Sequence, residues 1–169
     1  MNLSLSRINV ERFVYRLAAT LLVLVVVALG WSAARAAAAP IAVQDSDISG
    51  VEVALLEVKR TSGDTVTVRW EYRNKGDKQR ELEKVGLNEA DHFKLAGAAY
   101  LVDAGNKKKY LVVRDQNGTP LGSRATNFRV PPNDTLSIWA KFPAPPANVQ
   151  KISVYAPHSA PFDDVPIGK

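Results

Sequence analysis

A segment of alternating apolar and polar residues between residues 64 and 73 constrains the fold of this chain more than any other feature. Its apolar side chains occupy every second position, at Val66, Val68, Trp70 and Tyr72, and threonine or charged residues separate them. A strand places successive side chains on opposite faces, whereas a helix would distribute these four around its circumference. The segment therefore predicts an antiparallel strand with one face in a hydrophobic core.

Further strands are predicted along the rest of the chain. Residues 135–142 repeat the alternation, and residues 51–59 alternate until a register shift between Leu55 and Leu56, which is typical of a β-bulge. Turn-forming runs rich in Asn, Asp, Gly and Pro separate most of the segments. Shorter or weaker candidates lie at residues 82–87, 98–103, 109–114 and 152–155.

About seven short strands of this kind predict an all-β fold, a single antiparallel immunoglobulin-like β-sandwich over residues 50–169. Ala104-Gly105-Asn106 is predicted to be a hairpin turn, and residues 89–95 to form one helical turn. Residues 37–49 are expected to be a mobile lead-in. The chain contains no cysteine, so packing without disulfides must hold the sandwich.

The first 36 residues have the organisation of a secretory signal peptide. Three arginines precede a 15-residue run at 17–31 that is apolar apart from Thr20 and Gly30, and a stretch of small residues follows. This order predicts export, cleavage after Ala36 or Ala38, and a mature protein that is periplasmic or secreted. Retention of the leader as a membrane anchor is the alternative, although the run is shorter than the roughly 20 residues that span a bilayer. No other membrane contact is expected.

The positive charge of the chain comes mainly from this leader. The whole sequence has a formal net charge of +5, but four arginines and one glutamate lie within the first 36 residues. The mature chain is therefore close to neutral. A balanced surface of this kind excludes the basic footprint of a nucleic-acid-binding protein, so no nucleic-acid partner is expected.

Several short motifs follow one another in an order that resembles a bacterial immunoglobulin-like family. The motifs are Asn74-Lys-Gly-Asp77, Leu101-Val-Asp103 with Lys108-Lys-Tyr110, Val130-Pro-Pro-Asn-Asp-Thr135 and Trp139-Ala-Lys-Phe-Pro143. The family comprises exported β-sandwich domains of unknown function, the DUF4352-like group, and the similarity covers about residues 50–156. The resemblance implies an immunoglobulin-like fold in the cell envelope, and it implies no catalytic residues.

Few residues point to catalysis or to metal binding. His92 and His158 are the only histidines and are far apart in the sequence, so both are interpreted as surface residues. Asp163 and Asp164 could supply oxygen ligands for calcium, or they are simply solvated carboxylates. No nucleophile-elbow, zinc-protease or phosphate-loop motif occurs. We therefore predict that the protein is not an enzyme and has no catalytic residues, no metal site and no cofactor.

Four residues are candidate partner contacts. Lys107, Lys108 and Lys109 follow the hairpin turn, where they could meet an anionic polymer or an anionic lipid surface. Lysines at such a position also protect an exposed strand against edge-to-edge aggregation. Trp139 shares the outward face of its strand with polar residues, so it could anchor a partner, unless the Pro-rich segment or the C-terminal tail covers it.

The sequence as a whole predicts a non-enzymatic periplasmic or envelope domain that recognises a protein or a cell-envelope component. A structural envelope protein that self-associates through its sheet edges is the alternative. A third possibility, an enzyme or a metal-handling protein, has no motif in its favour. The oligomeric state is left open by the sequence.

Overall fold

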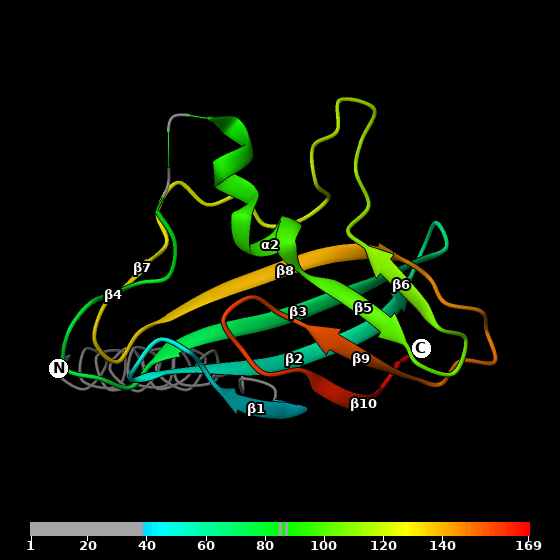
Figure 1. The fold of residues 1–169 in the computed structure, drawn as a ribbon, viewed down its shortest axis with the longest axis horizontal. Coiled ribbons are helices and arrows are strands. Elements are labelled where there is room, and N and C mark those ends of the chain that lie inside the picture. The colour runs from blue at the N-terminus through cyan, green and yellow to red at the C-terminus, as the bar shows by residue number, and fades with distance from the viewer. Residues whose placement is uncertain (1–38, 85, 87) are drawn as a thin grey trace, which may run out of the picture. The chain divides into compact units, whose positions relative to one another are not determined.

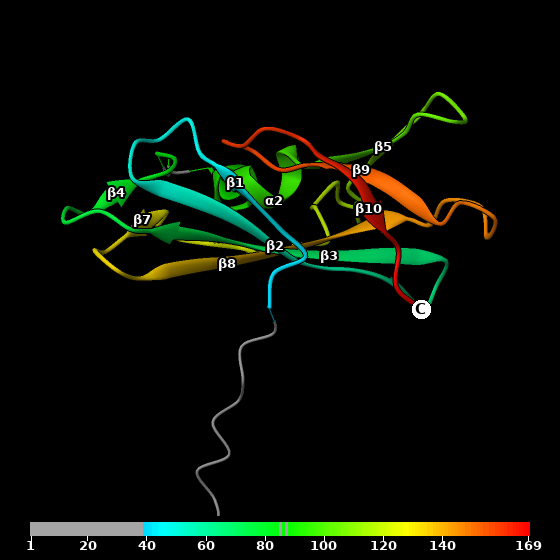
Figure 2. The ribbon, with the colours of Figure 1, turned by 90° about the horizontal axis from the view of Figure 1, so that it is seen from below.

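Two four-stranded antiparallel sheets form the body of the structure, a computed structural model that describes residues 39–84, 86 and 88–169. The first sheet has the order β1 (Ala42–Asp45), β2 (Val51–Thr61), β3 (Thr65–Asn74), β8 (Thr135–Pro143). The second has the order β10 (Phe162–Pro166), β9 (Lys151–Tyr155), β5 (Tyr100–Asp103), β6 (Lys108–Leu111). The sheets form two layers (Figures 1 and 2). The predicted all-β antiparallel sandwich is therefore confirmed.

Two smaller features complete the described part of the chain. A short ladder joins β4 (Arg80–Glu81) to β7 (Arg129–Val130), and a helical segment consists of η1 (Glu89–Phe93) and α2 (Lys94–Ala98). The helical turn expected at residues 89–95 is confirmed. Ten strands are present in these residues, compared with the seven or so expected. The expected signal peptide, its two cleavage positions and the alternative membrane anchor lie outside the described residues.

The core contains the side chains that the alternation of β3 places inward. Val66, Val68, Trp70 and Tyr72 have no exposed surface at all. They belong to one cluster with apolar side chains from the second sheet, including Leu101 of β5. The unit that contains this cluster, Ala38–Lys169, is compact by itself. Because every member of the cluster lies within this unit, residues 38–169 hold the complete described core.

The irregularity in β2 occurs where the sequence predicts it. The pairing of β2 with β3 shifts register between Leu55 and Glu57, which confirms the predicted bulge. An extra residue lets both Leu55 and Val58 face the core, where they are 0% and 3% exposed, while Leu56 is half-buried. The bulge thus keeps an apolar residue inward on both sides of the shift.

The hairpin between β5 and β6 also forms as predicted. Asp103 pairs with Lys108 across the strands, and residues 104–107 make the turn. The carboxylate of Asp103 accepts hydrogen bonds from the backbone nitrogen of Asn106 at 3.1 Å and from its side-chain nitrogen at 2.7 Å. Lys107 closes the turn with a φ of 52°, in the left-handed region. Side-chain hydrogen bonds of this type stabilise tight turns.

Three segments differ from expectation, because tertiary structure decides which segments find a strand edge to pair with. Residues 42–45 of the expected mobile lead-in form β1, which pairs in register with residues 52–55 of β2. Residues 82–87 were expected to form a strand, but the short ladder begins earlier, at β4, and Leu82 is buried after it. Residues 152–155 are the last strand that the sequence predicts, but the C-terminal tail contains a further strand, β10, which pairs with β9.

Part of the β2 edge and part of the β8 edge of the first sheet are covered by other segments. Beyond β1, the edge of β2 pairs with Gly168, whose backbone nitrogen donates to the Val58 carbonyl oxygen at 2.8 Å. On the opposite edge, residues 121–123 run along β8, and the Ser123 nitrogen donates to the Trp139 carbonyl oxygen at 2.8 Å. These contacts satisfy backbone groups that an open edge would leave available for another chain.

Candidate functional site

The helical segment packs on the sandwich through its apolar residues. Leu95 and Ala96 of α2 are each 1% exposed and belong to the core cluster. Gly122 passes directly beneath them: a Cβ atom there would lie 2.8 Å from the Cβ of Ala96 and 2.9 Å from the Trp139 carbonyl oxygen. Only glycine permits this approach without displacement. The segment that leads to β8 is thus held tightly against α2.

The loop at residues 114–120 stands opposite the helical segment and is ordered by its own hydrogen bonds. Asp115 donates its backbone nitrogen to the Thr119 carbonyl oxygen at 2.9 Å, and Oδ1 of Asp115 accepts from the backbone nitrogens of Asn117 and Thr119 at 2.9 and 2.8 Å. Gly118 has a φ of +81°, which glycine adopts without strain. The loop is therefore a preorganised turn.

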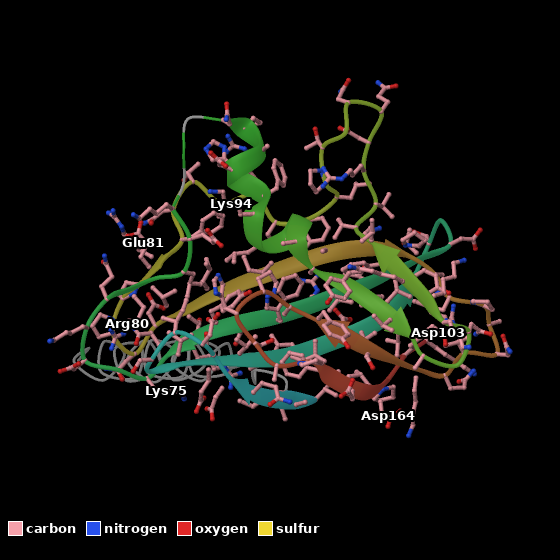
Figure 3. All side chains as sticks on the ribbon, in the orientation of Figure 1. Lys75, Arg80, Glu81, Lys94, Asp103 and Asp164 are labelled. Carbon is pink, nitrogen blue, oxygen red and sulfur yellow. The ribbon has the colours of Figure 1, made fainter. Side chains whose placement is uncertain are left out.

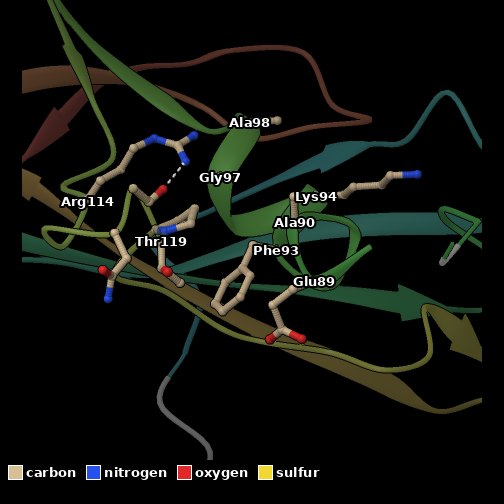
Figure 4. Close-up of a pocket in the computed structure, with 11 residues that line it drawn as sticks. Glu89, Ala90, Phe93, Lys94, Gly97, Ala98, Arg114 and Thr119 are labelled. Atoms are coloured by element: carbon tan, nitrogen blue, oxygen red, sulfur yellow. Dashed lines mark hydrogen bonds between the residues drawn. The ribbon is translucent and has the colours of Figure 1, made fainter. Parts of the chain in front are cut away.

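A pocket of about 470 Å³ lies between the helical segment and this loop (Figure 4). This volume is within the range of about 300–1,000 Å³ that is usual for ligand sites. The apolar part of the lining comes from Ala90, Phe93, Gly97, Ala98 and Pro120. The polar part comes from Glu89, Lys94, Arg114, Asn117, Gly118 and Thr119. Phe93 is only 8% exposed, so its ring is anchored in the structure while one part of it faces the pocket.

Two of the three charged residues that line the pocket are neutralised by neighbours. Glu89 makes two contacts with the guanidinium of Arg124, at 2.6 and 3.1 Å. These hydrogen bonds, with smaller contributions from charge attraction, hold the pKa of Glu89 below its usual range. Lys94 lies 3.3 Å from a carboxylate oxygen of Asp91 and donates to the Lys84 carbonyl oxygen.

Arg114 is the third charged residue and differs from the other two. Its Nη1 donates to the Gly118 carbonyl oxygen at 2.7 Å, the interaction drawn in Figure 4. Within the part of the chain that the structure describes, no carboxylate lies within ion-pair distance of it. The side chains of Asn117 and Thr119 likewise have no hydrogen-bond partner among the described residues. The pocket therefore combines an apolar lining with one unneutralised cation and two free polar groups.

The three lysines that the sequence indicates as contacts lie elsewhere, at the β5–β6 hairpin. All three are exposed. The ammonium nitrogen of Lys109 lies 3.6 Å from the centroid of the Tyr100 ring, and that of Lys108 lies 5.0 Å from the centroid of the Tyr110 ring. Figure 3 marks the hairpin by Asp103 and the helical segment by Lys94, in separate regions of the domain. Two of these lysines are thus engaged with aromatic rings of their own sheet.

The tyrosines beside the hairpin form a stack on the outer face of the second sheet. Tyr100 and Tyr155 stack with their centroids 4.5 Å apart and their planes 12° from parallel. They lie directly opposite each other on β5 and β9. Leu111, the most exposed large apolar side chain of the described residues at 62%, pairs with Tyr100 from the other side. The stack and Lys109 therefore reinforce the sheet at its surface.

Trp139 faces outward on β8, as the alternation predicts, and is half-buried. It lies opposite Arg69 of β3, and its backbone nitrogen donates to the hydroxyl of Ser123 at 2.9 Å. Since β8 belongs to the first sheet and the lysines to a hairpin of the second, the structure does not bring the four candidate contacts together. They do not form one site.

The two histidines are half-buried rather than fully exposed, and each faces carboxylates. His158 has Nδ1 3.0 Å from Asp47 and Nε2 3.3 Å from Glu83, while Nδ1 of His92 lies 3.3 Å from Glu89. His158 thus connects two segments that are distant in the sequence, whereas His92 contacts a residue of its own helical turn. No three side chains of His, Asp or Glu lie close enough to hold a metal ion within residues 39–84, 86 and 88–169.

The aspartates considered for calcium are both exposed on β10. Asp164 has a φ of 53°, and the pairing of β10 with β9 shifts register between Phe162 and Val165, on either side of the two aspartates. Asp163 and Asp164 therefore lie at an irregularity in an edge strand. No helix in the described residues has the length and apolar composition needed to span a membrane.

Most residues of the pocket were not predicted from the sequence. The sequence predicts the helical turn at 89–95, and Gln116-Asn117-Gly118-Thr119-Pro120 is one of its turn-forming runs, but nothing in the sequence indicates that the two face each other. The signal that could have been used is the run of small residues at Ala96-Gly97-Ala98 directly after the helical turn, which leaves room for another chain segment. The unneutralised charge of Arg114 can be seen only in the folded protein.

The fold and this pocket define an antiparallel all-β sandwich domain with a ligand-sized pocket outside its two sheets. No protein-family model, curated protein or solved structure matches this chain.

Proposed function

We propose that this protein is an exported, non-enzymatic binding domain of the bacterial cell envelope, and that the pocket between the helical segment and loop 114–120 is its recognition site. The observation that carries the proposal is the guanidinium of Arg114, which lines a ligand-sized pocket beside Phe93 without an oppositely charged partner in the described residues. The organisation of the first 36 residues supports export to the periplasm or beyond the cell.

We interpret the strand order as immunoglobulin-like. With β1 set aside, the order β2-β3-β8 corresponds to strands A-B-E, and β10-β9-β5-β6 corresponds to G-F-C-C′. Rigid sandwiches of this kind commonly present binding residues on the segments between their strands. The helical segment and loop 114–120 are such segments, because they flank the hairpin β5–β6 in the chain. Membership of the DUF4352-like group is part of the same proposal.

Self-association through sheet edges is less well supported. In the second sheet, the edge strand β6 carries exposed Lys108 and Lys109, and the opposite edge strand, β10, carries exposed Asp163 and Asp164 and ends at Pro166. Charged side chains, prolines and irregular pairing at an edge all oppose the addition of another strand. We therefore expect sedimentation velocity of residues 38–169 to give a monomer at every concentration. A mass that rises with concentration would favour the structural alternative.

The binding role can be tested by nuclear magnetic resonance. Residues 38–169, labelled with ¹⁵N, are titrated with a fragment library of carboxylates, amines, sugars and short peptides. We expect at least one class to shift the amide resonances of residues 89–98 and 114–120. An absence of shifts with every class, or shifts centred on residues 107–109 or Trp139, would refute the pocket as the recognition site.

A pair of matched variants makes the result specific. Ala90→Trp places a large side chain in the pocket at an exposed position, and Ala104→Trp adds the same side chain at the exposed hairpin turn. Neither change touches the core. We expect Ala90→Trp to abolish the shifts and Ala104→Trp to leave them unchanged, with far-UV circular dichroism as the check that both variants fold.

A further inference from the structure

We propose that the pocket binds the C-terminal residue of a peptide, with its free carboxylate on Arg114 and an apolar side chain against Phe93. This inference rests on the proposed function, because it names the ligand of the same pocket. It depends on three properties of the pocket: the available donors of Arg114, the apolar lining beside them, and the free polar groups of the loop.

The guanidinium of Arg114 is equipped to hold a carboxylate. It carries five N–H donors, and one hydrogen bond, to the Gly118 carbonyl oxygen, is formed in the structure. That bond fixes one side of the planar group. Its Nη2 lies 4.0 Å from the position that a Cβ atom on Gly97 would occupy, so it is held close to the end of α2. The remaining donors form a planar fork, which matches the two oxygens of a carboxylate better than a sugar hydroxyl or an ammonium group.

The lining beside Arg114 suits an apolar side chain. In Figure 4 the Phe93 ring lies between Arg114 and Glu89, with Ala90, Gly97 and Ala98 along the same helical segment. Of the residues that the helical segment contributes to the lining, only Glu89 and Lys94 have polar side chains, and Lys94 lies 3.3 Å from a carboxylate oxygen of Asp91. Because Glu89 is neutralised by Arg124 and Lys94 by Asp91, this end of the pocket does not require a second charge on the ligand. A ligand with one negative charge and one apolar group therefore fits the charge distribution.

A fatty acid also joins a carboxylate to an apolar group, but the free polar side chains of the loop favour a peptide over it. The amide of Asn117 and the hydroxyl of Thr119 line the pocket on the same loop as Arg114, and neither is hydrogen-bonded within the described residues. A peptide has backbone N–H and C=O groups directly before its terminal residue, which can pair with these two side chains. An acyl chain would desolvate them without offering a partner, and that is unfavourable.

The experiment compares three probes on residues 38–169 by isothermal titration calorimetry. The probes are acetyl-Ala-Leu with a free carboxylate, the same dipeptide as its C-terminal amide, and octanoate. We expect the free acid to bind at least about tenfold more tightly than the amide, since a hydrogen bond to a charged group is worth roughly 1.5–3 kcal/mol. Octanoate is expected to bind more weakly than the free acid.

Variants assign the difference to Arg114. Arg114→Gln is expected to reduce the affinity for the free acid to that for the amide and to leave the amide unaffected, while Arg114→Lys gives an intermediate affinity because it keeps the charge without the fork. Arg129→Gln is the control, because Arg129 is exposed on β7 and does not line the pocket. Thermal melting shows whether each variant is folded.

The outcomes separate this inference from the proposed function. If the amide binds as tightly as the acid, or if octanoate binds most tightly, the peptide-carboxylate assignment is wrong. The pocket is then still a binding site provided that Ala90→Trp blocks the probe that binds. If Ala90→Trp leaves the binding of every probe unchanged, the recognition site lies elsewhere and the proposed function of the pocket fails as well.

Discussion

Asn74 holds together the loops at one end of the sandwich, and its removal tests how far buried hydrogen bonds stabilise this domain. It is the last residue of β3 and is 1% exposed. Its side-chain nitrogen lies 2.8, 2.9 and 3.0 Å from the carbonyl oxygens of Lys78, Val130 and Pro131. Its side-chain oxygen accepts from the backbone nitrogen of Gly76 at 3.0 Å. A single amide thus joins the turn after β3 to the chain around β7.

The expected effect of Asn74→Ala follows from these contacts. The amide has two hydrogens to share among three carbonyl oxygens, so it makes the equivalent of two donated bonds and one accepted bond. Each contributes about 1 kcal/mol net, and buried partners left without a bond add to the loss. We therefore expect the free energy of unfolding to fall by about 3 kcal/mol. Since a domain of this size is stable by roughly 5–15 kcal/mol, the change is large.

Urea denaturation of residues 38–169, followed by tryptophan fluorescence, measures this change. Trp70 is fully buried and reports the loss of the core. Asn127→Ala is the matched control, because Asn127 is exposed and its side-chain oxygen accepts one hydrogen bond, from the Arg129 nitrogen at 3.0 Å. We expect the control to lose less than about 1 kcal/mol. The reasoning is refuted if the two variants are destabilised equally.

Three further perturbations have definite expected outcomes. Arg60→Ala removes hydrogen bonds to three carbonyl oxygens of the Pro-rich loop, those of Pro145, Pro146 and Val149. Limited proteolysis should then cut this loop faster, with Arg60→Lys intermediate, and an unchanged rate would mean that these hydrogen bonds do not hold the loop in place. Gly122→Ala should lower the unfolding free energy by about 1–3 kcal/mol in urea, because the added Cβ would lie 2.8 Å from the Cβ of Ala96; no loss would mean that the α2 contact relaxes freely. Hydrogen bonds from the side chain and backbone of Asn106 lower the pKa of Asp103, so its stabilisation is present above the unfolded-state pKa of about 4 and is lost as pH falls through the folded-state pKa. Asp103→Asn should therefore reduce the difference in stability between pH 7 and pH 3, and an unaltered difference would count against this role.

The strands predicted from the sequence are those whose signal is local. The alternation in β3 and β8 identifies both strands and their inward faces without knowledge of any partner, because the side-chain period of a strand is two. The bulge at Leu55 and the hairpin turn at Ala104-Gly105-Asn106 are also predicted by the types of a few consecutive residues. Each of these features can be recognised within about ten residues of sequence.

The candidate site could not be predicted from local sequence patterns in this way. Trp139 is outward, as predicted, and Lys107, Lys108 and Lys109 are exposed, but they belong to different sheets and form no common site. The pocket instead depends on the approach of residues 89–98 to residues 114–120. Neither segment has a periodic pattern that identifies its neighbour.

The amino-acid sequence alone thus determined the class of fold, the inward face of the long strands and the position of the tight turns, because backbone geometry and local side-chain chemistry decide these. Tertiary structure alone decided that residues 42–45 and 162–166 are strands, since short segments become strands only when a neighbouring edge offers them hydrogen bonds. It likewise decided which charges are neutralised. Arg114 is an ordinary arginine in the sequence, and it becomes a candidate binding residue because folding pairs Glu89 with Arg124 and leaves Arg114 beside the apolar part of the pocket lining.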